Sequence, residues 1–307
     1  MSVIRLGLAQ VEASFGDQEQ QNLVRALDLV RQAGERDVDL LAFAENFPGP
    51  FTDANRYEVA EPMARAAREH GVAVAYGTSL PDPDRPGSFN ITTVVVDDRG
   101  EERGAYRRTH PVGPYIYRDS PEWNFDYVAA DDFPVIDMPW GKLGISICSE
   151  VHLPEVTRIL ALRGAEVVLY PSGLLIDELG YTEAWQTLVH ARAIENHLYT
   201  ATLVNLMSRS VAEQFAGESF ESSGPGLTRG IGMVASPEGI LARSPEPGIL
   251  VAELDLERTR YLRRTTEELI VPAPYRTIPG HLDWRRPELY GTLLEAAREA
   301  APSARQG

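Results

Sequence analysis

The 307-residue chain is 43% hydrophobic and 24% charged, which is typical of a soluble globular protein with a substantial core. Its net charge of −16 argues against a surface that binds nucleic acid or anionic lipid. Membrane insertion is not expected either, because no apolar run approaches the roughly 20 residues that span a bilayer.

The N-terminus and the cysteine content favour a cytoplasmic location. The opening MSVIRLGLAQ lacks the basic segment and apolar stretch of a secretory signal. Cys148 is the only cysteine, so an internal disulfide is impossible. We therefore expect a cytoplasmic protein without nucleic-acid or membrane partners.

In the first part of the chain, short apolar runs alternate with helical patterns. Apolar residues spaced three and four apart predict helices, and short runs rich in β-branched residues predict strands. We expect strands at residues 3–10, 39–44 and 72–77, and helices at 19–35 and 55–71, the second with a regular start near Pro62.

The middle of the chain reads as hairpin-like strands, and alternation of strands and helices then resumes. Strands are predicted at 91–97, 101–108, 133–139, 143–148, 167–170, 200–206, 230–235 and 249–255, and helices at 153–164, 181–198 and 289–299, with an extended segment at 272–287. This order predicts sheets covered by helices, a layered α/β sandwich. We expect one domain, residues 1–307, with a C-terminal extension from about 270 to 307.

Cys148 is placed where a strand turns into a helix. A lone cysteine is more often a small buried hydrophobe than a catalyst. Here it ends an apolar strand and precedes a helical segment that opens near Pro154. Such a turn exposes the side chain and directs backbone N–H groups at it, which favours both a thiolate and an oxyanion.

Several ordered segments of the chain resemble the nitrilase (carbon–nitrogen hydrolase) superfamily. Its nucleophile segment is similar to GKLGISICSEVHLPEVTRILALRGAEVVLYPS, with an acidic residue two positions after the cysteine. The strand that ends in its catalytic glutamate is similar to VDLLAFAEN, and its catalytic-lysine segment is similar to GAYRRTHP. Its Arg-Ala-x-Glu-Asn signature is similar to part of WQTLVHARAIENHLYTATLVN. The resemblance covers nearly the whole chain.

The resemblance implies a fold, an assembly and a mechanism. The implied fold is a four-layer α-β-β-α sandwich, usually paired into a homodimer, and no cofactor is implied. Cys148 would attack an amide or nitrile carbon to give a thioester that water hydrolyses. Glu45 would carry the proton, Glu122 would help to hold the site, and the backbone N–H of Ser149 would stabilise the oxyanion. Glu122 is interpreted almost equally well as a solvent-exposed carboxylate in a loop.

Further positions are candidates for substrate binding. Phe51, Tyr115 and Trp123 lie in predicted loops after the catalytic strands and could line the pocket, although loop aromatics equally often anchor a loop. Ser172, in the Pro-Ser pair after the next strand, joins this group by resemblance. His110 fits a family histidine, with a structural hydrogen bond as the favoured interpretation. No pair of His or Cys residues has metal-ligand spacing, so no metal site is expected.

The chain departs from the family pattern at Arg108. The family places lysine there, and its ammonium is thought to stabilise the oxyanion. Only Lys142 among the 29 Lys and Arg residues is a lysine, and its predicted turn favours a solvent-facing role. A guanidinium keeps the charge but is a broad planar fork. The enzyme therefore runs on arginine, has changed its reaction, or has lost activity.

Several functions stay open at this stage. An amidase on a small amide is favoured, weakly, over a nitrilase, because Cys148-Ser149-Glu150 matches neither the Cys-Trp-Glu of nitrilases nor the common amidase Cys-Tyr-Asp. Acyl transfer to an amine is a second reaction on the same scaffold. A non-catalytic or impaired binding protein is the alternative that Arg108 raises.

Overall fold

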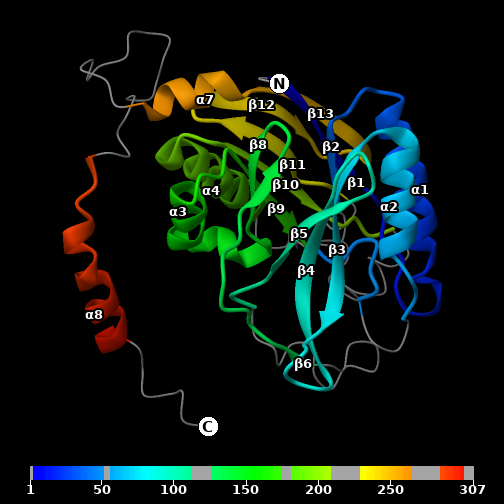
Figure 1. Ribbon diagram of the computed structural model, residues 1–307, viewed down its shortest axis with the longest axis horizontal. Coiled ribbons are helices and arrows are strands. Elements are labelled where there is room, and N and C mark those ends of the chain that lie inside the picture. Colours follow the sequence, from blue (N-terminus) through cyan, green and yellow to red (C-terminus); the bar gives the residue numbers. More distant parts are fainter. Residues whose placement is uncertain are drawn as a thin grey trace.

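A computed structural model describes residues 3–51, 56–111, 126–173, 181–208, 229–264 and 284–300. Two mixed β-sheets lie against each other, and helices cover their outer faces (Figure 1). The predicted four-layer α-β-β-α sandwich is thereby confirmed. In the part of the chain that the structure describes, no helix is long and apolar enough to cross a membrane.

The first sheet contains the N-terminal strands and one strand from late in the chain. Its central strands β1, β2 and β3 run parallel, and the outer pairings β13–β1, β3–β4 and β4–β5 are antiparallel. The order is β13 (Gly248–Asp255), β1 (Val3–Gln10), β2 (Leu40–Ala42), β3 (Ala73–Pro81), β4 (Ser88–Val96) and β5 (Glu102–Arg107), with β6 (Asp126–Tyr127) paired to β4. Helices α1 (Gln21–Gly34) and α2 (Ala60–His70) cover its outer face (Figure 1).

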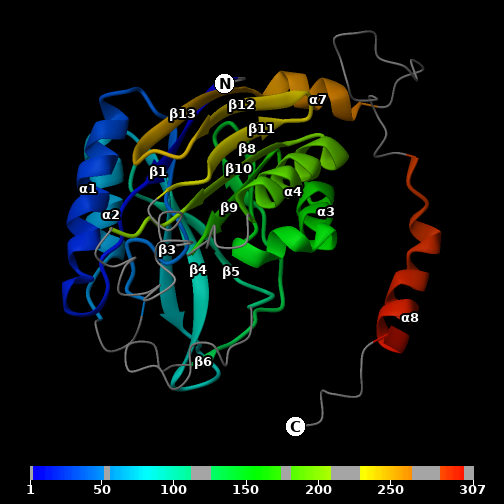
Figure 2. The same ribbon diagram turned by 180° about the vertical axis from the view of Figure 1, so that it is seen from behind.

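The second sheet repeats this arrangement with strands from the second half of the chain. Its strands β8, β9 and β10 are parallel, and antiparallel strands flank them. The order is β12 (Gly239–Ser244), β11 (Gly232–Ser236), β10 (Tyr199–Val204), β9 (Val167–Ser172), β8 (Gly141–Ile145) and β7 (Ile136–Met138). Helices α3 (Pro154–Leu162) and α4 (Tyr181–Asn196) cover it (Figure 2).

Two apolar cores hold the layers together. The larger joins α1 and α2 to both sheets, and the smaller lies between the second sheet and helices α3 and α4. Strands β9 and β10 are buried at every residue, because they are covered on both faces. Since the parallel strands of each sheet end at one edge, their following loops bring polar side chains to that edge.

The sequence pattern missed three elements, one of them the short strand β6, and misplaced several boundaries. Strand β12 and helix α7 (Leu256–Arg263) were not predicted, and the strand expected to reach Cys148 ends at Ile145. Residues 148–152 instead form the 3-10 helix η3 (Cys148–His152). Other short elements are η1 (Gly16–Gln18) and η7 (Pro287–Leu289). Helix α8 (Gly291–Ala300) lies apart from the layers in both views (Figures 1 and 2).

Candidate active site

Cys148 lies in a sharp turn between β8 and η3. Its backbone φ is 54°, in the left-handed region that residues other than glycine rarely adopt. This conformation turns the chain abruptly from the strand into the 3-10 helix, and the half-buried cysteine packs against both apolar cores. The strand-to-helix turn predicted from the sequence is therefore present, with a tighter geometry than a simple strand end.

Glu45 and Arg108 follow strands of the first sheet and are both buried. The backbone N–H of Glu45 donates to the Ser172 carbonyl (3.2 Å), and Asn205 Nδ2 donates to the Glu45 carbonyl (2.8 Å). Ser172 and Asn205 lie at the ends of β9 and β10, so the second sheet fixes the backbone of Glu45. Arg108 comes directly after β5 and is only 2% exposed.

The Arg108 guanidinium connects the two sheets. Its Nη1 donates to Glu45 Oε1 at 2.7 Å, and its Nη2 donates to Ser149 Oγ at 2.6 Å. A guanidinium has separate N–H donors in a fixed plane, which suits two acceptors that lie side by side. The charge predicted at position 108 is therefore in the site and paired with the candidate base.

The Cys148 thiol lies against the Glu45 carboxylate. Burial, the charge of Glu45 and a hydrogen bond between the two side chains together raise its pKa to about 12. Arg108 and the Gly173 backbone N–H act in the opposite direction. A Cβ at Gly173 would come within 3.0 Å of Glu45 Oε2, so glycine leaves room for the carboxylate. At neutral pH the thiol is protonated and has a base beside it.

Glu150 connects the cysteine turn to the arginine segment. Its fully buried carboxylate accepts hydrogen bonds from the Tyr106 hydroxyl (2.9 Å) and from the backbone N–H groups of Thr109 (2.8 Å), His110 (3.0 Å) and Ile147 (2.6 Å). The Thr109 hydroxyl adds a further bond at 2.6 Å. These bonds hold the residues on either side of Arg108 against the residue that precedes Cys148.

The protonation of Glu150 follows from these bonds. Burial alone raises its pKa, but the hydrogen bonds from His110, Thr109 and Ile147 and the charge of Arg108 outweigh burial, so the pKa lies below its usual range. The sequence offered one signal for this residue, its position two after the cysteine in the resembling segment. That signal did not identify Glu150 as part of the site.

Arg192 fixes the turn from the helix side. It is buried on α4, and its Nε and Nη2 both donate to the Val151 carbonyl in η3, at 3.1 and 2.9 Å. The Arg-Ala-x-Glu-Asn segment therefore reaches the cysteine turn through its arginine. The resemblance of this segment to the family signature did not by itself indicate a part in the site.

The remaining predicted residues divide into two groups. Ser172 is fully buried, its hydroxyl donates to the Tyr170 carbonyl (3.3 Å), and its own carbonyl accepts from Glu45. Phe51 is buried with its ring 5.3 Å from that of Phe15, and its N–H donates to the Glu19 carboxylate. Three other predicted residues lie outside the described residues: Glu122, Tyr115 and Trp123.

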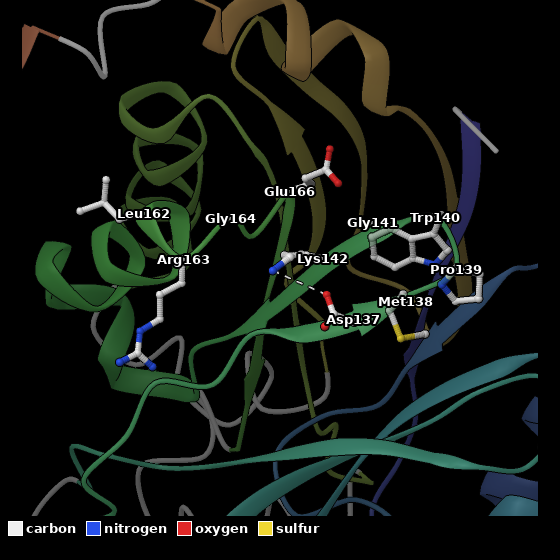
Figure 3. A pocket seen from close by; sticks show the side chains of 10 residues that line it. All are labelled: Asp137, Met138, Pro139, Trp140, Gly141, Lys142, Leu162, Arg163, Gly164 and Glu166. Carbon is white, nitrogen blue, oxygen red and sulfur yellow. Dashed lines mark ion pairs between the residues drawn. The ribbon is translucent and has the colours of Figure 1, made fainter.

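An open groove lies at the opposite end of β8 from Cys148. It runs over the β7–β8 turn and the end of α3, and Figure 3 shows Lys142 directed at Asp137, 3.6 Å away. Glu166, at the same groove, is paired with Arg260 at 2.6 Å. These charged side chains at the groove are therefore paired with one another. Among the described residues, no cluster of three or more His, Cys, Asp or Glu side chains could hold a metal ion.

Two amidases are among the known proteins that this chain resembles. The chain is 28% identical over 265 residues to the deaminated glutathione amidase of Synechocystis sp., and the aligned region covers 81% of this chain and 91% of that protein. It is 25% identical over 279 residues to the omega-amidase NIT2 of Mus musculus, covering 86% and 93%.

Solved structures show the same fold. A carbon–nitrogen hydrolase from Helicobacter pylori G27 matches with a TM-score of 0.73 at 24% identity, covering 95% of this chain and 98% of that chain. A glutamate-to-glutamine mutant of the Nesterenkonia sp. AN1 amidase matches with a TM-score of 0.64 at 26% identity, covering 83% and 92%. That structure shows covalent addition of the acetamide moiety of fluoroacetamide at its active-site cysteine. The carbon-nitrogen hydrolase family model matches residues 5–264, and this chain is a member of the carbon–nitrogen hydrolase family.

Proposed function

We propose that this protein is an amidase that hydrolyses small amides through a thioester on Cys148. The observation that carries the proposal is the Arg108 guanidinium, which donates to Glu45 Oε1 at 2.7 Å and to the hydroxyl of Ser149, the residue after Cys148, at 2.6 Å. A nucleophile, a base and a fixed positive charge therefore meet in a buried place. Relatives that are amidases support an amide as the substrate.

In the first half of the reaction, Cys148 Sγ bonds to the amide carbon as its proton passes to Glu45. Because burial and Glu45 together raise the thiol pKa to about 12, the proton leaves during the attack, and a thiolate is not formed beforehand. The carbonyl oxygen gains negative charge, which the Ser149 backbone N–H and the Arg108 charge stabilise. The carbon–nitrogen bond then breaks, and Glu45 returns the proton to the leaving nitrogen.

In the second half, water attacks the thioester carbon. Glu45 takes a proton from the water, the carbon–sulfur bond breaks, and the proton goes to the departing sulfur. The products are a carboxylic acid and ammonia or an amine, and Cys148 returns as a thiol. Every proton in this scheme therefore passes through Glu45.

The proposed amidase activity is tested by measuring ammonia release from a panel of small primary amides and nitriles. The wild-type protein is expected to release ammonia from at least one amide, faster than from the corresponding nitrile. The C148S variant is the control, since it keeps the shape of the turn and replaces the thiol with a poorer nucleophile. Equal ammonia release by C148S, or none by the wild type, contradicts the proposal, and the second result favours a non-catalytic binding protein.

We also propose a cytoplasmic homodimer. The resemblance to the nitrilase superfamily supports pairing, and so do the exposed apolar side chains of α8, Leu293 and Leu294, on a helix that lies apart from the layers (Figure 2). Light scattering is expected to give twice the 33.9 kDa chain mass. A species of 33.9 kDa alone contradicts the dimer.

A further inference from the structure

Ser149 contributes a side chain to the site as well as a backbone N–H. Its hydroxyl oxygen lies 2.6 Å from Arg108 Nη2, while Nη1 of the same guanidinium lies 2.7 Å from Glu45 Oε1. Arginine has donors and no acceptor, so the serine oxygen must be the acceptor. The two bonds leave from different nitrogens of one rigid plane and end on residues from the two sheets.

We propose that Ser149 is a positioning residue whose hydroxyl orients the Arg108 guanidinium, so that the two side chains act as one unit. The inference rests on the proposed function, in which Arg108 stabilises the oxyanion. The bond to Glu45 ties the guanidinium to the first sheet. The second bond, to the residue that follows the nucleophile, fixes the plane relative to Cys148.

The burial of Arg108 makes the second bond important. Its side chain is 2% exposed, so water cannot readily replace a lost partner. A buried charge that loses a hydrogen bond either pays the desolvation cost or moves towards another acceptor. Movement of about 1 Å at a catalytic charge can cost about 100-fold in rate. Loss of the serine hydroxyl therefore disturbs the reaction through Arg108.

Lysine at position 108 would not form the same unit. It presents one nitrogen in place of the two that bond Glu45 and Ser149 separately, and it has no planar fork. The arginine in this chain is consequently matched to the serine beside the nucleophile. If this is so, the effect of removing the serine hydroxyl must depend on the presence of the arginine.

A double-mutant cycle on Ser149 and Arg108 tests this dependence. S149A is expected to lower kcat about tenfold with KM within about twofold, and R108K to lower kcat about 100-fold. The double variant is expected to be no slower than R108K alone, because the bond that S149A removes is already lost. S149T keeps the hydroxyl and is expected to recover most of the activity.

S146A is the matched control. Ser146 is fully buried two residues before Cys148, and its hydroxyl has no hydrogen-bond partner within the described part of the chain. This variant is expected to keep kcat within about twofold. Multiplicative losses in the double variant, an unchanged S149A, or an equal loss in S146A would each overturn the positioning role.

The proposed hydrolase activity and the proposed positioning of Arg108 by Ser149 can be tested separately. If no amide is turned over, the same cycle is measured on the rate at which iodoacetamide alkylates Cys148, whose thiol pKa Arg108 lowers. If the effects of the two substitutions on the alkylation rate do not multiply in the double variant, the coupling of Ser149 and Arg108 is supported and only the hydrolase activity is contradicted. A multiplicative alkylation cycle overturns the pair, and a wild-type protein with neither turnover nor alkylation contradicts both.

Discussion

The two sheets contribute different parts of the proposed reaction. The first sheet supplies the base and the charge, Glu45 after β2 and Arg108 after β5. The second supplies the nucleophile and its neighbour, Cys148 and Ser149, in the turn after β8. Neither sheet contains a complete site, although each has three parallel strands flanked by antiparallel ones. Catalytic geometry in this fold is therefore a property of how the sheets are joined.

The contacts that hold the two sheets together differ between the interior and the edge of the sandwich. In the interior, apolar side chains of both sheets form one core, which favours contact without fixing positions finely. At the edge, directional hydrogen bonds cross between the sheets, from Asn205 to Glu45, from Arg108 to Ser149 and from Thr109 to Glu150. Breaking these bonds one at a time should impair the reaction while the apolar core keeps the chain folded.

Removal of the base should have the largest effect. E45Q is expected to lower kcat by about 10²–10⁴-fold, because the amide cannot take the thiol proton. The same variant should alkylate faster at pH 8, since the charge and hydrogen bond of Glu45 both raise the thiol pKa. Steady-state kinetics and iodoacetamide labelling measure the two effects.

E166Q is the matched control for E45Q. Glu166 is also largely buried and paired with an arginine, but it lies by the groove at the opposite end of β8. Its replacement is expected to leave both turnover and alkylation of Cys148 within about twofold of the wild type. Turnover of E45Q within tenfold of the wild type, or slower alkylation, would refute the assignment of the base.

Weakening the bond network of Glu150 should have the next effect. In the wild type, hydroxyl and backbone N–H donors face the Glu150 carboxylate. In E150Q one carboxylate oxygen becomes an NH₂ group that cannot accept from them, so the free energy of unfolding at pH 7 is expected to fall by about 2–4 kcal/mol. The kcat is expected to fall about tenfold, because the cysteine turn and the arginine segment lose their common anchor. Urea unfolding followed by tryptophan fluorescence gives the stability.

The pH dependence of that loss has a definite sign. The folded-state pKa of Glu150 lies below its value of about 4.3 in an unfolded chain, so the stabilisation is complete above that pH. It is lost as the pH falls through the folded-state pKa, and the difference between wild type and E150Q should shrink below about pH 4. A difference that stays constant or grows on acidification would show that the carboxylate charge is not what stabilises this site. E155Q, in the first turn of α3, is the exposed control and is expected to change stability by less than about 0.5 kcal/mol.

Changes at the groove should have the smallest effect. The pair between Lys142 and Asp137 is largely exposed, and such pairs contribute at most about 1 kcal/mol. K142A is expected to keep kcat within about twofold and to change stability little. A tenfold fall in kcat, restored in K142R, would show instead that the only lysine takes part in the reaction.

The sequence was sufficient for the residues placed by strand ends. Glu45, Arg108 and Cys148 lie at or directly after the end of a predicted strand, so their approach could be expected from resemblance and pattern. Glu150 could not be recognised in the same way, because its importance comes from donors about 40 residues away in the chain. The partner of Arg108 on Ser149 likewise depends on side-chain directions that spacing does not determine.

The missed elements have equally physical causes. Strand β12 is an outer strand with several exposed residues, so it lacks the clear apolar alternation of a buried face. Helix α7 is short and buries only Leu256, Thr259 and Leu262, which is a weak helical stripe. Its start is fixed by the Asp255 side chain, which accepts from the Glu257 N–H.

In the proposed reaction, Cys148 holds the acyl group as a thioester at the edge where the two sheets meet. The most direct test of this thioester is intact-protein and peptide mass spectrometry after rapid acid quenching of turnover on a small amide. The peptide that contains Cys148 is expected to gain the mass of the acyl group, and this gain should disappear in C148S. Ammonia release with no adduct on Cys148, or an adduct on another residue, would contradict it.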